Sequence, residues 1–465
     1  MTGRQRLTLI VLLTASFTLA VDFSILNVAL PTVGADIGFS LENLQWIATS
    51  FALCAAGLTL LFGRVADLVG RRRMFIIGMA LLGAGSLLGG IASGPILLII
   101  ARVAQGIATA IVVPAALSLL LSSFPEGKLR EKALGLNGAL MAAGFTTGAI
   151  LGGLLTDLLS WRWAFLINVP VAAAVLVLAP MVLAESRPTD KTRLDVPGAI
   201  TVTLGLLALV FGLTRAAESS WTDPTTLGAF AAAVILLAAF VAVEHRTATP
   251  LVPLAILKRP TVAWGNISGI LAFVTETSLV FLLTLYLQQV LDYTPLGAGL
   301  AFAVLGLGTV LGGVLGPKAI SRVGNKRAIV YGFTVQAIAT ASLVLLSYDP
   351  ASIILLLIAT FVGGAANLVV IVGFMVTATT GLSDKESGLA TGLATMSQQI
   401  GITMGIPVMS AIVTARLVAL GSTDAPAVLS GVTLAIWVNA ALCLATAMFV
   451  ACFLRAPVTE EASAS

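Results

Sequence analysis

Charged residues are scarce in this sequence. Only 10% of its 465 residues are Asp, Glu, Lys or Arg, whereas 58% are hydrophobic, and the mean hydropathy is +1.06. This balance excludes a soluble globular protein. A membrane-spanning helix needs roughly 20 mostly apolar residues, and such runs recur along almost the whole chain with short polar breaks between them. We therefore expect an all-α polytopic membrane protein, embedded in a lipid bilayer, with no sizeable soluble domain.

Residues that build catalytic and metal sites are equally scarce. His245 is the only histidine, and the sequence has no HExxH motif, no G-x-S-x-G elbow and no phosphate-binding glycine loop. The cysteines Cys54, Cys443 and Cys452 lie inside predicted spans without metal-ligand spacing. We expect neither an enzyme nor a metal or cofactor site. The net charge of +4 does not indicate nucleic-acid binding, because it follows from membrane topology.

The hydrophobic runs divide into fourteen predicted membrane helices. Their approximate ranges are 8–30, 44–62, 74–93, 96–122, 133–158, 163–184, 197–214, 227–244, 262–287, 297–317, 327–346, 352–378, 388–414 and 432–454. With the N-terminus in the cytoplasm, every Lys and Arg falls on the cytoplasmic side except Arg102, Arg162, Arg215 and Arg416, as the positive-inside rule predicts. The even number of spans then puts both termini in the cytoplasm. The first run lacks a cleavage site, so we expect it to be retained as a helix.

The chain also contains an internal repeat. The loop GRVADLVGRRR, at 63–73, is similar to PKAISRVGNKR, at 317–327, when Gly70 is aligned with Gly324. This offset of 254 residues fits two six-helix halves with two further helices between them. We expect an N-terminal bundle over 1–184, a linker with two additional helices over 185–260, and a C-terminal bundle with a short tail over 261–465. Paired halves of this kind place a substrate site near the membrane midplane and work by rocking around it.

Two motifs resemble those of a known superfamily. The loop at 63–73 resembles the loop motif of the major facilitator superfamily. The run LLIIARVAQGIATA, at 97–110, resembles that superfamily's fourth-helix motif, with Arg102, Gln105 and Gly106 at its basic, amide and glycine positions. The resemblance implies the major facilitator fold.

Two further motifs resemble those of one subfamily. The run LAVDFSILNVALP, at 19–31, is similar to the first-helix motif of the fourteen-spanner drug:proton antiporters, and WRWAFLINVP, at 161–170, is similar to their sixth-helix signature. This resemblance implies proton-coupled efflux of lipophilic small molecules such as drugs, antibiotics and dyes, by alternating access.

The fifth-helix motif departs from the subfamily's pattern. It reads GFTTGAILGG at 144–153, with Ala149 where the antiporters have a proline. Its glycines mark one helix face where backbones can approach closely, and the resemblance implies that this face seals one conformation. These glycines are Gly144, Gly148, Gly152 and Gly153. An uptake symporter or a uniporter for a small metabolite, on the same fold, stays open as an alternative.

Asp22 places a carboxylate inside the first hydrophobic run. A charge near the bilayer centre costs about 2.5–3.5 kcal/mol, so Asp22 should be paired, protonated or exposed to a wet cavity. At about 1.5 Å per residue, Asp22 and Arg102 reach the same level of the membrane. We predict that they interact, directly or through water, and that Asp22 takes up and releases the transported proton. The alternative is a permanent ion pair that fixes helix packing.

Glu276 is a second acid inside a predicted span, with no basic residue at its level. An unpaired carboxylate at this depth is expected to be protonated at rest, or to face the cavity and meet a cationic substrate. The alternative is a neutral Glu276 that forms a hydrogen bond to a neighbouring helix. We group Glu276 with Asp22 and Arg102 as the predicted proton-coupling residues.

Two further sets of residues complete the predicted site. Amides that line the substrate cavity are predicted to be Asn27, Gln105, Gln398 and Gln399, whereas the other mid-span amides are expected to join helices. The predicted cytoplasmic gating loop contains Gly63, Asp67, Gly70 and Arg71. In this loop the resemblance implies that Asp67 pairs with Arg71, or with the neighbouring half, and holds the cytoplasmic side closed.

Together these features predict a monomeric, multi-pass transporter of the cell membrane. It exports a small-molecule substrate in exchange for protons, and the proton gradient drives it without a cofactor.

Overall fold

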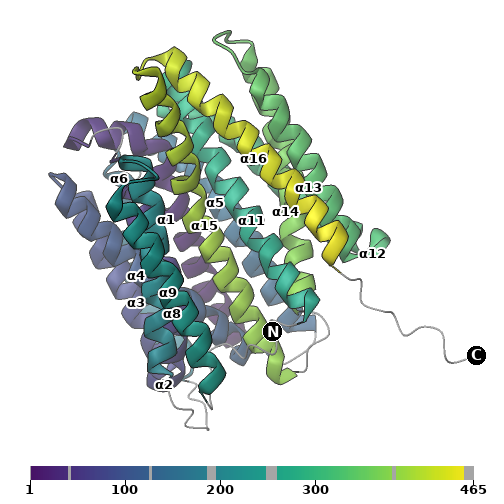
Figure 1. Ribbon diagram of the computed structural model, residues 1–465. Coiled ribbons are helices and arrows are strands. Elements are labelled where there is room, and N and C mark those ends of the chain that lie inside the picture. The colour runs from purple at the N-terminus through teal and green to yellow at the C-terminus, as the bar shows by residue number, and fades with distance from the viewer. Residues whose placement is uncertain are drawn as a thin grey trace, which may run out of the picture.

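The computed structural model describes residues 2–39, 43–44, 46–124, 128–185, 195–247, 259–379 and 384–454, and its regular elements there are all helices. In chain order they are α1 (Gly3–Ile37), α2 (Trp46–Val69), α3 (Arg71–Gly90), α4 (Pro95–Ser123), α5 (Lys128–Leu158), α6 (Trp163–Leu166), α7 (Asn168–Val182), α8 (Val196–Glu218), α9 (Pro224–Arg246), α11 (Pro260–Leu285), η1 (Tyr286–Val290), α12 (Pro295–Val323), α13 (Asn325–Ser342), η2 (Leu343–Leu345), α14 (Ser352–Thr379), α15 (Asp384–Leu420) and α16 (Ala425–Phe453). Figure 1 shows them as a bundle of long rods.

Each predicted range corresponds to helix in the structure, although the ends differ. The sixth range is interrupted at Ile167 and forms α6 and α7. Many helices begin before the predicted residue because their capping residues lie outside the hydrophobic run. Asp424, for example, accepts a hydrogen bond from the Ala427 N–H at 3.0 Å and starts α16.

The same capping chemistry starts α9. Asp223 accepts hydrogen bonds from the backbone N–H groups of Thr225 and Thr226. The hydrogen bond from the Thr225 hydroxyl, together with these N–H groups, holds the pKa of the Asp223 carboxyl below its usual range.

Twelve helices in the described part of the chain are long and apolar enough to cross a membrane. Two shorter apolar stretches, Val28–Ile37 in α1 and Trp46–Thr59 in α2, accompany them. The molecule is therefore an all-helical, multi-pass membrane protein. Helices α2 and α5 also contain side chains that lie outside the described residues.

The bundle has two distinguishable ends. Helix α1 begins and α16 ends at the same end, which we call the terminal side (Figure 1). At the opposite end, the distal side, α5 ends at Leu158 and α12 begins at Pro295. Below, the N-terminal half means α1–α7 and the C-terminal half means α11–α16.

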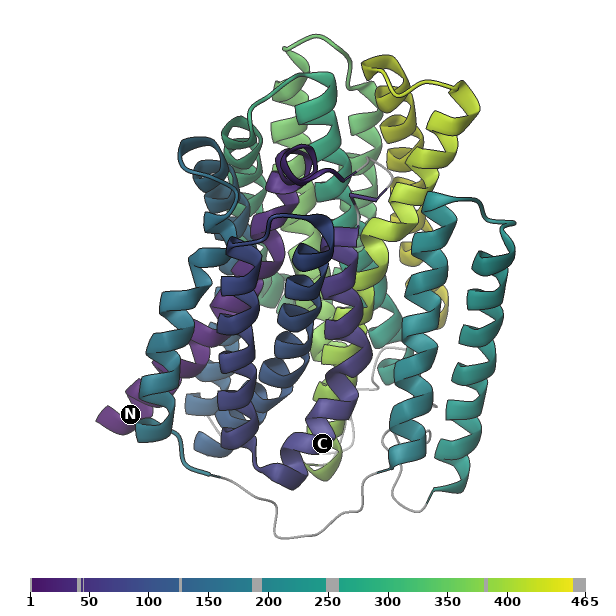
Figure 2. The same ribbon diagram turned by 90° about the vertical axis from the view of Figure 1, so that its left-hand side faces the viewer.

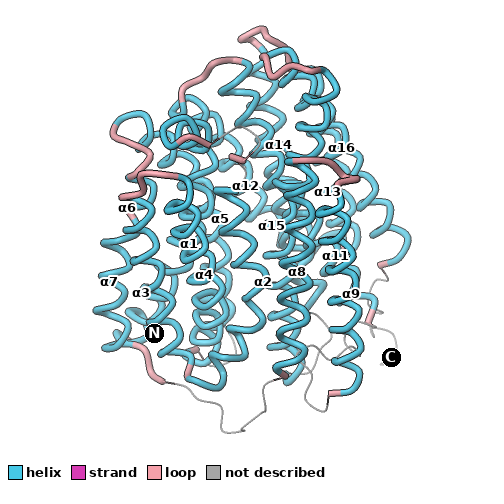
Figure 3. Tube along the Cα trace, turned by 60° about the vertical axis from the view of Figure 1, so that its left-hand side comes forward, coloured by secondary structure: helices cyan, strands magenta, loops and turns pink. Residues whose placement is uncertain are grey.

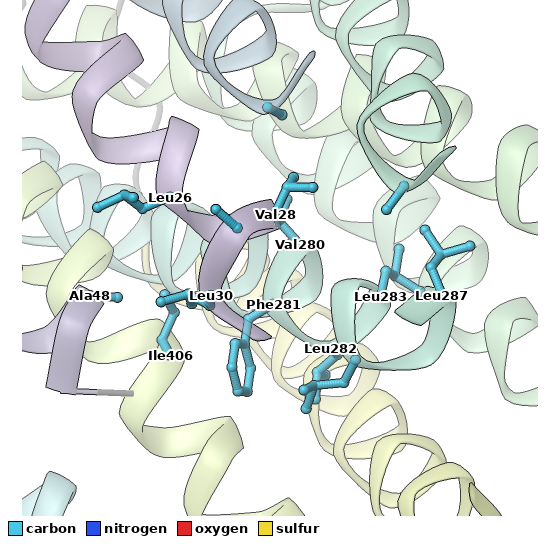
Figure 4. Packing of buried hydrophobic residues seen from close by; sticks show 14 of the residues in the cluster. Leu26, Val28, Leu30, Ala48, Val280, Phe281, Leu282, Leu283, Leu287 and Ile406 are labelled. Atoms are coloured by element: carbon cyan, nitrogen blue, oxygen red, sulfur yellow. The ribbon is translucent and has the colours of Figure 1, made fainter. Parts of the chain in front are cut away.

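One hydrophobic core joins the two halves on the distal side. It contains Leu30 of α1, Phe281 of α11 and Ile406 of α15, all buried. Figure 4 shows these side chains gathered where the three helices meet. On the terminal side the described residues form separate cores, one around Phe75 in the N-terminal half and one around Phe333 in the C-terminal half. Within the described residues, the two halves are therefore joined by the distal core and by a smaller core that contains Phe51 of α2 and Phe374 of α14.

Helices α8 and α9 stand as a pair at one flank of the bundle (Figures 2 and 3). The Thr203 hydroxyl of α8 donates a hydrogen bond to the Gly57 carbonyl of α2 at 2.8 Å. Ala199 of α8 also shares a small core with Val262 of α11 and Leu393 of α15. Helix α8 thus contacts both halves, whereas α9 packs chiefly on α8.

Candidate functional site

Asp22 and Arg102 lie side by side inside the N-terminal half. Arg102 Nη1 is 3.5 Å from Asp22 Oδ2, and each side chain is 1% exposed. The sequence predicted that Asp22 and Arg102 lie at the same depth in the membrane, and the structure shows them in contact between α1 and α4. The distance is nevertheless long for a charge-assisted hydrogen bond, which is commonly about 2.7–2.9 Å.

Neutral donors hold the Asp22 carboxylate more closely than Arg102 does. Asp22 Oδ1 accepts hydrogen bonds from Gln105 Nε2, at 2.8 Å, and from Asn168 Nδ2. Both amides also donate to Ser86 Oγ, at 2.9 Å from Gln105 and 3.3 Å from Asn168. These side chains come from α1, α3, α4 and α7. We call the set the charged network; its members are Asp22, Ser86, Arg102, Gln105 and Asn168.

Helix α2 holds the Arg102 guanidinium from another side. Arg102 Nε donates to the Ile47 carbonyl at 2.9 Å, and its Cζ lies 4.3 Å from the centre of the Phe51 ring. Arg102 Nη1 also donates to Gln105 Oε1 at 2.8 Å. An aromatic face attracts a cation, and the attraction grows when water is excluded. Arg102 therefore keeps three partners even when Asp22 loses its charge.

Two glycines bring the helices of this site together. A Cβ at Gly106 of α4 would lie 2.9 Å from the Cys54 Cβ of α2, closer than real side chains approach. A Cβ at Gly85 of α3 would lie 3.2 Å from Gln105 Cγ. Because both positions lack a side chain, α2 and α3 can pack on α4 closely enough to reach Arg102 and Gln105.

Glu276 lies in α11 and is half-buried. Among the described residues, its carboxylate has no ion-pair or hydrogen-bond partner. The neighbouring hydroxyls of Thr275 and Thr277 donate to carbonyls of their own helix, at 2.9 and 2.8 Å. The structure therefore does not bring Glu276 into hydrogen-bonding contact with the charged network.

The amides predicted to line the cavity have different surroundings. Gln105 is 0% exposed and belongs to the charged network, so in this conformation it does not face a cavity. Gln398 is half-buried and Gln399 is 7% exposed, and no described hydrogen bond involves either side chain. Asn27 lies in α1, and its side chain is outside the described residues.

Three of the four fifth-helix glycines allow α5 to pack against α1. A Cβ at Gly144 would lie 2.9 Å from the Phe17 carbonyl oxygen, and one at Gly148 would lie 2.7 Å from that of Val21; Gly152 faces the Ile25 carbonyl in the same way.

Gly153 instead faces the other half, where a Cβ would collide with the Pro295 carbonyl of α12. On the opposing helix, a Cβ at Gly299 would lie 2.8 Å from the Ala149 carbonyl oxygen. The close contact between the halves is thus made by small residues at Ala149 and Gly153, without the proline found in the antiporters.

The stretch 63–73 lies on the terminal side and is mostly helical rather than the predicted loop, because only Gly70 separates the end of α2 from the start of α3. Gly70 has a φ of 116°, which side chains rarely adopt, and a Cβ there would lie 2.6 Å from Glu185 Oε1. Glu185 accepts a hydrogen bond from the Arg72 N–H at 3.2 Å at the start of α3. Gly63 packs against Pro114 of α4 and Arg71 begins α3, whereas the Asp67 side chain lies outside the described residues.

The C-terminal half holds a second buried polar network. Gln336 Nε2 donates to Thr275 Oγ1 at 3.1 Å, and Asn367 Nδ2 donates to Gln336 Oε1 at 3.3 Å. Asn439 Nδ2 donates to Ser278 Oγ at 2.9 Å and to the Thr275 carbonyl at 3.0 Å. All five side chains are at most 2% exposed. We call Thr275, Ser278, Gln336, Asn367 and Asn439 the neutral network.

The family model of the Major Facilitator Superfamily matches residues 12–406. The chain belongs to this superfamily. It is 38% identical to the cephamycin export protein CmcT of Amycolatopsis lactamdurans, over 86% of this chain and 83% of that protein. It is 36% identical to the puromycin resistance protein pur8 of Streptomyces alboniger, over 87% of this chain and 81% of that protein. Its fold is shared with the human organic anion transporter MFSD10, with a TM-score of 0.62 at 15% identity over 97% of this chain and 100% of that one.

These comparisons confirm the predicted relationship to major facilitator transporters of the drug-efflux type. Superfamily members are membrane transporters rather than enzymes, so the chain is a multi-pass transporter of the cell membrane.

Several members of the site were not predicted from the sequence. Asn168 was expected only to join helices, and Ser86, Phe51 and Glu185 were not considered. Asn168 lies in the sixth-helix signature, which was a usable signal. The other three gain their roles only from the packing of neighbouring helices.

Proposed function

We propose that this superfamily member exports lipophilic small molecules from the cytoplasm in exchange for protons, and that Asp22 carries the proton. The observation that supports this proposal is the fully buried contact between Asp22 and Arg102 inside membrane helices. Ionisable residues at such depth are costly and commonly mark ion or proton pathways.

The geometry supports a two-state cycle at Asp22. In one state the carboxylate accepts from Gln105 and Asn168 and lies beside Arg102. In the other state Asp22 is protonated, and Arg102 remains held by Ile47, Gln105 and Phe51. Because both states leave the buried cation with partners, Asp22 can bind and release a proton without leaving Arg102 unsatisfied.

The distal core and the separate terminal cores support a conformation that is closed on the distal side. Alternating access requires a second conformation in which the distal side is open. Rocking of the halves would then separate the close contact at Gly153 and Gly299 and open the distal side.

We further infer fourteen spans with both termini in the cytoplasm. The lengths of α2, 24 residues, and α5, 31 residues, support this count, since each exceeds the roughly 20 residues a span requires. The proposed domains are a six-helix bundle over 1–184, the α8–α9 linker within 185–260 and a second bundle over 261–465. We propose that the transporter acts as a monomer.

The names of the relatives suggest the substrate class to examine first. CmcT is named for cephamycin export and pur8 for puromycin resistance. We propose an antibiotic or a similar lipophilic compound as the substrate. Glu276, half-buried and without an ion-pair partner in the described residues, is proposed to meet the positive charge of a cationic substrate.

The test is substrate-driven proton movement in proteoliposomes with a trapped pH indicator. Puromycin and ethidium are supplied on one side, and the proton flux is recorded for the wild type and Glu276→Gln. Proton flux opposite to substrate flux is expected, with slower transport of the cations by Glu276→Gln. Flux in the same direction would indicate an uptake symporter, and substrate movement without protons would indicate a uniporter. Unchanged transport and coupling in a normally expressed Glu276→Gln would exclude the role of Glu276.

A further inference from the structure

Phe51 stands between the charged network and the junction of the two halves. Its side chain is 2% exposed, and its ring lies 4.3 Å from Arg102 Cζ. Its ring centre is also 5.8 Å from that of Phe23, the residue that follows Asp22 in α1. The same residue therefore contacts the guanidinium and a neighbour of the carboxylate.

Phe51 also belongs to an apolar cluster built from both halves. The N-terminal half contributes Phe23 and Phe51, with Phe145 packed against them at 5.1 Å from Phe23. The C-terminal half contributes Phe273 and Phe374, together with Ala378, Ala394 and Ile402. We call this set the central cluster.

The central cluster lies close in sequence to both membrane-embedded acids, Asp22 and Glu276. Phe23 is adjacent to Asp22, and Phe273 lies three residues, or nearly one helical turn, before Glu276. These rings are therefore the nearest aromatic surface, in sequence, to both acids.

The partners of Arg102 compete for its position. The Ile47 carbonyl and the Phe51 ring hold the guanidinium on α2, whereas Asp22 lies 3.5 Å away. Among the described residues, Arg102 is the charged side chain in contact with Asp22. The other hydrogen-bond partners of Asp22, Gln105 and Asn168, are neutral. A small shift of Arg102 therefore changes the main charge acting on Asp22.

We propose that Phe51 is a positioning residue that links occupancy of the central cluster to the charge of Asp22. A substrate that packs among the rings displaces Phe51 from Arg102, and Arg102 then moves closer to Asp22. The closer cation favours the ionised carboxylate, so the O–H bond of Asp22 breaks, the proton passes to water, and the oxygen keeps the electron pair. This inference rests on the proposed function and adds the route by which substrate binding releases the proton.

The experiment measures protons released per substrate bound, using purified protein in weakly buffered detergent with puromycin or ethidium as the probe. Binding is measured in parallel by equilibrium dialysis. Phe51→Leu removes the aromatic face but keeps an apolar side chain, and Phe51→Tyr keeps the ring. The matched control is Phe374→Leu, which changes the same cluster from the C-terminal half, where no contact with Arg102 is present.

We expect release per bound substrate to fall by roughly two- to tenfold in Phe51→Leu, the range that corresponds to the loss of one cation–π contact. Phe51→Tyr should release as many protons per bound substrate as the wild type. Phe374→Leu should change affinity while release per bound substrate stays the same. If Phe51→Leu does not fold, Phe51→Met takes its place.

Equal release per bound substrate by Phe51→Leu and the wild type would overturn the role of Phe51 while leaving the proposed exchange intact. An equal loss in Phe374→Leu would also overturn it, because the effect would then belong to cluster packing. No proton release by wild-type protein that binds the probe would instead overturn the proposed function, and the role of Phe51 with it.

Discussion

The two halves solve the same packing problem with different chemistry. The charged network joins α1, α3, α4 and α7, and the neutral network joins α11, α13, α14 and α16. With α6 and α7 counted as one interrupted helix, each network uses the first, third, fourth and sixth helices of its half. The neutral network holds its helices with uncharged groups, namely side-chain amides and hydroxyls together with a backbone carbonyl. Packing of these four helices therefore does not require an ion pair, which argues that Asp22 and Arg102 serve another purpose.

The repeat sharpens this comparison. Asp22 and Glu276 are separated by 254 residues, the same offset that aligns Gly70 with Gly324. Corresponding positions thus carry an acid in both halves, but only Asp22 has a basic partner in the described structure. In the proposed mechanism the two halves therefore have different roles: Asp22 of the N-terminal half binds the proton, and Glu276 of the C-terminal half meets the substrate's positive charge.

The largest expected effect comes from removing the acid of the charged network. Asp22→Asn keeps the size of the side chain and can still accept from Gln105 or Asn168, but it cannot bind a transported proton. We expect substrate-driven proton flux in proteoliposomes to fall to the level of empty vesicles. Asn439→Ala, the matched change in the neutral network, should leave protons moved per substrate unchanged. Coupled proton flux that persists in Asp22→Asn would show that Asp22 does not bind the transported proton.

Removing the cation of the charged network, Arg102, should instead reduce the thermal stability of the protein. Arg102→Met leaves Asp22 buried without its counter-charge, and breaking a buried pair from one side costs about 3–5 kcal/mol. Thermal unfolding in detergent should show a lower midpoint than in the wild type. The double variant Asp22→Asn with Arg102→Met should recover much of the loss, because no buried charge remains. Additive losses in the double variant would show that the two side chains are not energetically coupled.

The neutral network should show a smaller effect on stability. Asn439→Ala removes hydrogen bonds to Ser278 Oγ and to the Thr275 carbonyl, both fully buried. Leaving buried acceptors unpaired costs about 1–3 kcal/mol. The unfolding midpoint is expected to drop by less than in Arg102→Met. A larger drop than in Arg102→Met would mean that the neutral network contributes more to the stability of the fold than the ion pair does.

The smallest expected difference in stability is between alanine substitutions at the two aligned glycines, Gly70 and Gly324. Gly324→Ala meets no atom within 4 Å, so only its φ of 82° opposes the change, at about 1–2 kcal/mol. Gly70→Ala has a comparable backbone constraint and also meets Glu185 Oε1, so it should be the more destabilising. Combining it with Glu185→Ala should remove the additional part, which unfolding midpoints can measure. Equal midpoints for the two alanine variants would show that the Glu185 contact has no energetic weight.

The features that the sequence predicted well depend on local rules. The helices follow the hydrophobic runs, because each span must satisfy its backbone hydrogen bonds internally. The contact of Asp22 with Arg102 followed from the fixed rise of a helix within a bilayer of known thickness. Gly144, Gly148 and Gly152 also lie on one packed face, as their spacing indicated.

The features that were missed depend on which helices become neighbours. Nothing local to Phe51 or Ser86 shows that α2 and α3 will bring them to the charged network. Gln105 was assigned to a cavity because its depth is right, but its direction on α4 is set by packing against α1 and α3. Depth can be derived from the sequence, whereas the direction of a side chain between helices requires the tertiary structure.

The central claim is that Asp22 changes its protonation state when substrate binds. Infrared difference spectroscopy of the purified transporter, with and without puromycin, observes the carbonyl stretch of a protonated carboxyl group directly. We predict that substrate binding removes such a band in the wild type, and that the change is absent in Asp22→Asn but present in Glu276→Gln. A band change that persists in Asp22→Asn and disappears in Glu276→Gln would contradict the account and move the proton site to the C-terminal half.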